Sequence, residues 1–171
     1  MKFAAFILLL LAFLNSPGQK PISCTCKGFI DTSYRGTIYL MDSPKGKITQ
    51  SIPYEHIARN YLLFDITQVA DSFFFVRMNY AISGGTYQGW IKKAKHLITF
   101  VKRDGLELPL FYEASLTSKI RIKTSTKKVS QFEIFNCTQN WLYIRELKKV
   151  SLFHGWIHSK DQCANPTAVC K

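Results

Sequence analysis

From Ile22 onward, apolar and polar residues alternate over short runs separated by turn residues, and no stretch has the spacing of an amphipathic helix. Asp42-Ser43-Pro44-Lys45-Gly46, for example, is a turn signal that directly follows an alternating run. The pattern predicts strands at residues 37–41, 61–66, 73–78, 89–91, 108–112, 120–122, 129–135, 141–145 and 155–157. Many short strands with frequent turns are typical of small antiparallel barrels, so we expect an all-β protein.

The first eighteen residues have a different pattern. Met1-Lys2 gives a positive start, and residues 3–14 form an unbroken apolar run that Asn15-Ser16-Pro17-Gly18 ends. A helix of this length rises about 18 Å, well short of the ~30 Å hydrocarbon core of a bilayer. We therefore expect residues 1–18 to be a signal peptide, the mature chain to lack a transmembrane segment, and the protein to be secreted or periplasmic.

The mature region contains an internal repeat. Residues 71–77 resemble residues 139–145, and Gly89-Trp90-Ile91 resembles Gly155-Trp156-Ile157. Each copy has an aromatic strand ending in arginine, then a hairpin, then Gly-Trp-Ile. The pattern favours two copies of one small β unit over chance similarity within a single β domain.

The order of aromatic strand, hairpin and Gly-Trp-Ile resembles bacterial SH3-like domains. In the second copy, residues 135–137, 140–142, 155–158 and 161–166 resemble a group of exported bacterial proteins with SH3-like repeats. The resemblance implies two small SH3-like β-barrels in tandem. The expected layout is a signal peptide (1–18), a linker (19–28), a first domain (29–94), a linker (95–104), a second domain (105–163) and a tail (164–171).

Side chains on the aromatic strand alternate between two faces. Leu142 and Ile144 are expected to enter the core, which leaves Trp141, Tyr143 and Arg145 on a half-exposed face. The first copy has the same pattern: Phe74 and Val76 oppose Phe73, Phe75 and Arg77. The resemblance implies that this region borders a peptide-binding groove, and an aromatic shelf with arginine also stacks on sugar rings. The alternative is that these aromatic residues join the two copies. Trp90 and Trp156 are expected in the core or on a closing strand.

The charge is strongly positive, with 23 Lys and Arg against 11 Asp and Glu. Ten of the basic residues fall within residues 92–128 (92, 93, 95, 102, 103, 119, 121, 123, 127 and 128), against three acidic residues. Such a stripe attracts anionic envelope polymers, lipid headgroups or acidic proteins, or it is a solvated surface that keeps the protein soluble. We expect no nucleic-acid partner, because an exported protein seldom meets one.

Catalytic motifs are missing from the sequence. It has no P-loop, Gly-x-Ser-x-Gly or His-Glu-x-x-His run, and no catalytic domain fits after the second copy. We therefore expect neither an enzyme nor a cofactor.

The five cysteines are Cys24, Cys26, Cys137, Cys163 and Cys170, all candidates for disulfides in an oxidising compartment. The preferred pairing ties down the Cys163/Cys170 tail, either internally or to Cys137, and one of Cys24 and Cys26 is expected to be free. The cysteines with His154 and His158 are numerous enough for zinc, but their spacing matches no zinc ribbon or finger, so no metal is expected.

These features favour a non-catalytic binding module of the cell envelope. The expected ligand is a peptide, a peptidoglycan fragment or another anionic envelope polymer. The first alternative is a protein–protein assembly subunit of an exported complex, and the second is a small cell-wall hydrolase. The oligomeric state does not follow from the sequence.

Overall fold

The computed structural model describes residues 20–55, 60–101, 107–125, 131–147 and 153–164. These residues form thirteen strands and one short 3-10 helix, η2 (Ser159–Asp161), which confirms the all-β class. The strands of the first half are β1 (Ile22–Ile30), β2 (Gly36–Met41), β3 (Ile48–Tyr54), β4 (Leu62–Ala70), β5 (Phe73–Tyr80) and β6 (Gly84–Lys92). Those of the second half are β7 (Leu97–Val101), β8 (Glu107–Phe111), β9 (Ile120–Ser125), β10 (Phe132–Thr138), β11 (Trp141–Glu146), β12 (His154–His158) and β13 (Gln162–Cys163).

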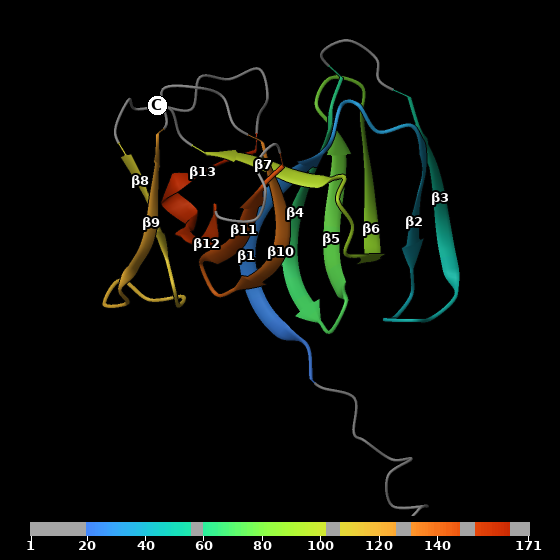
Figure 1. Ribbon diagram of the computed structural model, residues 1–171. Coiled ribbons are helices and arrows are strands. Elements are labelled where there is room, and N and C mark those ends of the chain that lie inside the picture. The colour runs from blue at the N-terminus through green and yellow to red at the C-terminus, as the bar shows by residue number, and fades with distance from the viewer. Residues whose placement is uncertain (1–19, 56–59, 102–106, 126–130, 148–152, 165–171) are drawn as a thin grey trace, which may run out of the picture.

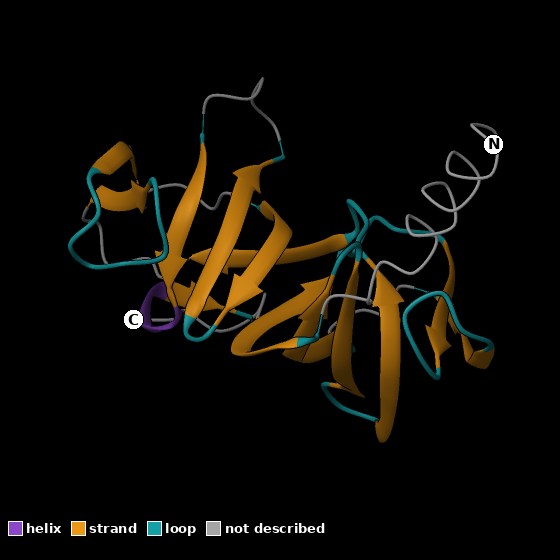
Figure 2. Ribbon diagram, turned by 90° about the horizontal axis from the view of Figure 1, so that it is seen from below, coloured by secondary structure: helices purple, strands orange, loops and turns teal. Residues whose placement is uncertain are grey.

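All the strands join one antiparallel sheet. Its order is β3-β2-β6-β5-β4-β1-β7-β10-β11-β12-β8-β9, and β13 pairs with β7 off this path. Figure 1 shows β1 and β7 between the two groups of strands, and Figure 2 shows these groups from below. The sheet is open, with β3 and β9 at its ends. The sequence-based expectation of two closed barrels is therefore not confirmed.

The sheet consists of two units with the same strand order. The first unit, β1–β6, pairs in the order β3-β2-β6-β5-β4-β1, and the second unit, β7–β12, pairs as β9-β8-β12-β11-β10-β7. Irregularities also recur: β4 has a bulge at Thr67 against β5, and β10 has one at Phe135 against β11. The sequence similarity between the two copies thus corresponds to one topology used twice.

The two units meet through β1 and β7. Phe29 and Ile30, at the end of β1, pair with Ile98 and Leu97 of β7. The end of β7 pairs with β13 in the same manner, through Val101 and Phe100. β13 therefore pairs with the first strand of the second unit in the same way as β7 pairs with the first strand of the first unit.

The glycine of each Gly-Trp-Ile run lies where two strands approach closely. A Cβ atom on Gly155 would lie 2.9 Å from the carbonyl oxygen of Phe111, and one on Gly89 would lie 3.0 Å from that of Met41. Backbone cannot yield as a flexible side chain can. The glycine thus lets β12 cross β8, and β6 cross β2, which explains its recurrence in the sequence.

The hairpins before the aromatic strands β5 and β11 also match. Asp71 and Gln139 stand at equivalent positions with φ of 48° and 47°. Residues with a Cβ seldom adopt this left-handed conformation, and Asp tolerates it better than Gln. The turn of the second unit is therefore the more strained of the two.

The core runs through both units. One cluster of buried side chains includes residues of each, such as Leu40 and Val76 of the first and Leu110 and Ile144 of the second. As the alternation predicted, Leu142 and Ile144 are completely buried. Phe74 and Val76 are completely buried as well. The apolar faces of the two sheet halves thus form a shared interior.

Several expectations need correction. Residues 19–28 and 95–104 were predicted as linkers, but they contain β1 and β7, which join the two units. The pattern also missed β3, and β6 begins at Gly84, five residues before the predicted strand at 89–91. The predicted signal peptide, residues 1–18, lies outside the described residues. Within the described ranges, no helix has the length and apolar character needed to cross a membrane.

Candidate functional site

The second unit carries a pocket of about 260 Å³ lined by Phe135, Tyr143, Arg145 and His154. Small-molecule pockets usually span about 300–1,000 Å³, so this one is sized for a single side chain or sugar ring. Two of its residues, Tyr143 and Arg145, belong to the shelf predicted from the sequence. Phe135 and His154 are additions from the neighbouring strands β10 and β12.

The strand register brings the four side chains together. On β11, Tyr143 and Arg145 are two residues apart and share a face. Arg145 pairs with His154 across to β12. On β10, Ile134 pairs with Ile144 and Asn136 with Tyr143, so Phe135 is the extra residue of a bulge. A bulge re-aims the side chain it carries, and here Phe135 turns toward the pocket.

His154 is held by two hydrogen bonds that fix its tautomer. Its Nε2 atom lies 2.7 Å from Nη2 of Arg121, and its Nδ1 atom lies 2.6 Å from Oη of Tyr143. Because a guanidinium can only donate, Nε2 must accept, and the ring proton must be on Nδ1. Nδ1–H then donates to Tyr143, whose own hydroxyl proton remains available to a ligand.

Arg145 is held in place from two sides. Its Nη2 atom donates to Oε2 of Glu133 at 2.8 Å, and its guanidinium lies 4.4 Å from the ring centre of Phe135. The Glu133 side chain is 9% exposed, whereas that of Arg145 is 39% exposed. The pair thus anchors the arginine while leaving part of its guanidinium at the pocket.

The environment keeps His154 neutral. Burial lowers the pKa of His154 below its ordinary value, and the nearby charges of Arg121 and Arg145 lower it further. This direction agrees with the tautomer argument, since Nε2 must be unprotonated to accept from Arg121. Around neutral pH the pocket therefore carries the positive charge of Arg145, which is paired with Glu133, and the charge of Arg121 lies beside it.

The four side chains together can recognise a ligand. They offer a hydroxyl donor, a guanidinium and two aromatic faces, which together recognise an acceptor group attached to a ring or an apolar stem. The aromatic faces are those of Phe135 and Tyr143, whose ring centres are 6.4 Å apart and nearly perpendicular.

The first unit does not repeat this site. Its residues at the four equivalent positions are Thr67, Phe75, Arg77 and Gln88. Only the arginine is retained, so the first unit has no hydroxyl at the position of Tyr143 and no imidazole at the position of His154. The carboxylate matching Glu133 is Asp65, which is exposed and lies 3.7 Å from Lys27.

The structure also places the remaining predicted shelf residues. Trp141 was expected on a half-exposed face, but it is only 6% exposed and packs edge-on against Phe111 and His158. Phe73 is equally buried, in a small cluster with Ala70 and Trp90. These two rings are thus structural, because β2 and β8 fold over the ends of the aromatic strands.

Phe75 and Arg77, the other two predicted shelf residues of the first unit, are less buried than Phe73. Phe75 is half-buried and meets Trp90 edge-on at 5.4 Å, and Arg77 is exposed. Trp90 is buried as expected, whereas Trp156 is half-buried with its ring 5.2 Å from that of Tyr143. In the described residues, the ring contacts of Trp141 and Tyr143 stay within the second unit. They do not join the two units.

The basic stripe is only partly described. Its residues 102, 103, 127 and 128 lie outside the described residues. Lys92, Lys95 and Lys119 are exposed, and Lys123 forms an exposed ion pair with Glu107 at 3.3 Å. Arg121 holds His154 and also lies 5.1 Å from the ring centre of Tyr112. One member of the stripe thus serves the pocket directly.

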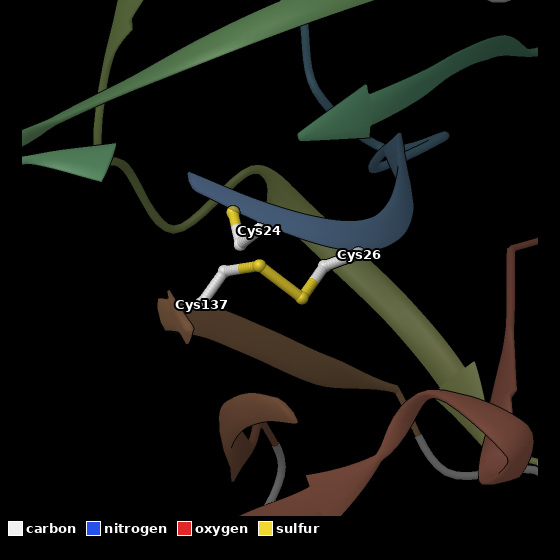
Figure 3. Close-up of side chains that lie close together, drawn as sticks. All are labelled: Cys24, Cys26 and Cys137. Atoms are coloured by element: carbon white, nitrogen blue, oxygen red, sulfur yellow. A yellow bond between two sulfur atoms is a disulfide. The ribbon is translucent and has the colours of Figure 1, made fainter. Parts of the chain in front are cut away.

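Cysteines join the units covalently. Cys26 of β1 and Cys137 of β10 form a disulfide with their Cα atoms 6.4 Å apart, and Cys24 is a buried free thiol (Figure 3). The expectation that one of Cys24 and Cys26 is free is confirmed, but Cys137 pairs with β1 and not with the C-terminal tail. Cys163 is also disulfide-bonded, and Cys170 lies outside the described residues.

The sulfur atoms of Cys24, Cys26 and Cys137 all lie within 4.8 Å of one another. This grouping differs from the cysteine–histidine set considered from the sequence, because His154 belongs to the pocket.

Comparisons of the chain with protein-family models, with curated proteins and with solved structures returned no significant match.

Proposed function

We propose that the protein is an exported, non-catalytic binding module of the cell envelope. Its pocket on the second unit holds a carboxylate-bearing peptide or peptidoglycan fragment. The proposal includes the assignment of both units as SH3-like, which rests on the repeated order of aromatic strand, hairpin and Gly-Trp-Ile. Export rests on the apolar run at residues 3–14.

The hydrogen bonds of His154 carry the proposal. Because Arg121 occupies Nε2 and Nδ1–H occupies a lone pair of Tyr143, the hydroxyl proton of Tyr143 is left to donate beside the guanidinium of Arg145. A carboxylate accepts from both groups at once, and hydrogen bonds to a charged partner are the strong ones. The net charge of +12 draws such anions toward the protein.

The size and walls of the pocket support one ring or one side chain next to the carboxylate. Phe135 and Tyr143 supply aromatic faces for it. A peptidoglycan fragment offers sugar rings and a peptide stem that ends in a carboxylate, so it matches both features. A free peptide matches the carboxylate and the apolar stem.

Titration calorimetry with a soluble disaccharide-peptide tests the proposal. We expect the fragment with a free carboxylate to bind, and its amidated form to bind at least tenfold more weakly. Tyr143→Phe removes only the hydroxyl and is expected to lower affinity about tenfold or more, because it deletes a hydrogen bond to a charged group. Equal binding of the two fragments, or unchanged affinity of this variant, would contradict the pocket assignment.

Two control variants match the test. Tyr39→Phe makes the same change at an exposed tyrosine of β2, and Arg77→Gln alters the arginine equivalent to Arg145 in the first unit. Neither is expected to change affinity. If Arg77→Gln weakens binding as much as Tyr143→Phe does, both units take part in binding.

A second candidate function is assembly with a partner chain. It is favoured by the strands β3 and β9, each of which has one side without a partner among the described strands. Open edges can pair with another chain. Light scattering over a range of concentrations distinguishes the functions: a stable oligomer in which Tyr143 is inaccessible supports assembly, and a monomer that binds the fragment supports the pocket.

A further inference from the structure

Cys24 lies beside a disulfide in a closed interior. It is 5% exposed, Cys26 is completely buried, and Cys137 is 1% exposed. The three sulfur atoms are within 4.8 Å of one another, and Figure 3 shows Cys24 and Cys26 on the same strand, next to the disulfide with Cys137. In this position the Cys24 thiol lies 3.7 Å from the carbonyl oxygen of Ile66, on β4. Two thiol positions on β1 are thus within reach of one cysteine on β10.

The strand β1 is irregular at the same point. Ser23 pairs with Gln68, and the next pair is Cys26 with Ile66, so Cys24 and Thr25 oppose the single residue Thr67. An extra residue in one strand leaves the ladder locally unpaired and bends the strand. Cys24 therefore lies where the pairing of β1 with β4 is interrupted.

That bulged segment is docked onto the end of β10. The backbone N–H of Thr25 donates to the carbonyl oxygen of Gln139 at 2.6 Å, and Cys24 forms an isolated bridge with Gln139. Gln139 follows Cys137 by two residues. The backbone contacts thus place both Cys24 and Cys26 next to Cys137.

We propose that Cys24 and Cys26 exchange as disulfide partners of Cys137, so that the covalent link between the two units has two alternative positions on β1. The thiolate of Cys24 attacks Sγ of Cys137 and forms the Cys24–Cys137 bond. The Cys26–Cys137 bond breaks, and its electron pair leaves on Sγ of Cys26, which takes up the proton that Cys24 released. There is no net oxidation, and no other reactant is needed.

Lys93 is the cation that assists this step. It is half-buried, its Nζ atom lies 3.4 Å from Oδ1 of Asn136, and it is 4.9 Å from the ring centre of Phe74. Asn136 directly precedes Cys137. Burial raises the pKa of the Cys24 thiol to about 12, and the charge of Lys93 opposes this rise. The exchange is therefore slow at neutral pH and faster in alkali.

The first test follows the free thiol in the intact, oxidised chain. Samples are held at pH 7, 8 and 9, quenched with acid, unfolded and labelled with N-ethylmaleimide, and fragment mass spectrometry locates the label. We expect label on Cys26 as well as Cys24, approached about tenfold faster for each pH unit because the thiolate fraction rises tenfold. Label confined to Cys24 at every pH, with circular dichroism showing a folded chain, would overturn the proposal.

Variants give an independent test. In Cys26→Ser we expect a Cys24–Cys137 disulfide in the folded, oxidised protein, and free thiols at both positions would overturn the proposal. Cys24→Ser is the matched control: it keeps the Cys26–Cys137 bond and places no label on Cys26. If Cys26→Ser fails to fold, the measurement on the intact chain decides.

Substitutions at Lys93 test its role separately. Lys93→Met is expected to slow the exchange severalfold, whereas Lys93→Arg keeps the charge and the rate. A purely structural lysine would leave the exchange rate of the folded Lys93→Met variant unchanged. That result would remove Lys93 from the proposal. Whether the exchange itself occurs would still be decided by the labelling of Cys26 in the intact chain.

Discussion

Nη2 of Arg121, on β9, lies 2.7 Å from Nε2 of His154, on β12. The strand β8 separates these two strands in the sheet, so the arginine reaches across it. A residue of the edge strand β9 thereby holds the imidazole of His154, two strands away, and adds to the effect of burial in lowering its pKa. The pocket consequently depends on the β8–β9 hairpin although that hairpin contributes none of its lining residues.

The first prediction concerns the titration of His154. Arg121→Gln removes a positive charge that lowers the pKa of this residue, so the pKa is expected to rise toward the ordinary value but to stay below it because burial remains. Imidazole resonances followed by NMR over pH 4–8 measure the shift. Lys123→Gln, two residues along β9, is the control and should leave the titration unchanged.

The pH dependence of stability follows from two histidines. Burial lowers the pKa of His96, as it does that of His154, in the folded state. As the pH falls below about 6.5, the unfolded chain takes up protons first. The free energy of unfolding should therefore be complete above that pH and decrease as the pH falls through the folded pKa values. Denaturant titrations at pH 7, 6 and 5 measure this, and equal stability throughout would contradict the lowered pKa values.

Removing the arginine of the buried ion pair is expected to destabilise the second unit. In Arg145→Met, Glu133 keeps its burial but loses the donor at 2.8 Å, which costs about 1–3 kcal/mol. Thermal unfolding of Arg145→Met and of the double variant Glu133→Met/Arg145→Met separates the two contributions. The double variant should recover part of the loss, and an equal or greater loss would show that the carboxylate is not the cause.

The close strand crossing predicts the effect of Gly155→Ala. The added Cβ would lie 2.9 Å from the carbonyl oxygen of Phe111, so the variant should lose about 1–3 kcal/mol of stability. Gly89→Ala repeats the experiment in the first unit, where the distance to the carbonyl oxygen of Met41 is 3.0 Å. Unchanged melting temperatures in both variants would argue against the crossing.

The strained turn predicts a stabilising substitution. Gln139 has φ of 47°, which glycine adopts freely, and its hydrogen bonds to Ser23 and Thr25 of β1 use backbone atoms, which glycine also has. Gln139→Gly should therefore raise the melting temperature by a few degrees. Gln88→Gly, in the regular part of β6, should lower it, since glycine weakens a strand by about 0.5–1 kcal/mol. The same sign for both variants would contradict the turn geometry.

The sequence pattern predicted those features of the fold that depend on neighbouring residues in the chain, such as strand faces and the internal repeat. The alternation of Leu142 and Ile144 with polar neighbours indicated the buried face of β11, and the repeated Gly-Trp-Ile indicated equivalent strands in two units. The strands β1 and β7 could not be predicted from the sequence, for different reasons. β1 has cysteines, a serine and a threonine in place of a clear apolar alternation, and β7 is a short run buried on both faces. Their pairing joins residues about 70 positions apart, which no local pattern reports.

The pocket was predicted only in part for a similar reason. The aromatic strand indicated Tyr143 and Arg145, but it placed Trp141 with them because strand alternation does not say which strand covers that end of the shelf. Phe135 faces the pocket through a bulge, and His154 is brought in by the register of β12. An alignment of the two copies does contain a signal for these two residues. Phe135 and His154 are aromatic or titratable where the first copy has the small polar residue Thr67 and the amide Gln88, so the second copy differs from the first at both positions.

The pairing of β13 with β7 has a consequence for how such a chain grows. The end of β1 pairs with β7, the first strand of the next unit, and the end of β7 pairs in the same way with β13. A further unit that began at β13 would therefore branch from β7, because β13 lies off the main path of strands. Such an addition would leave β3 and β9 as the ends of that path.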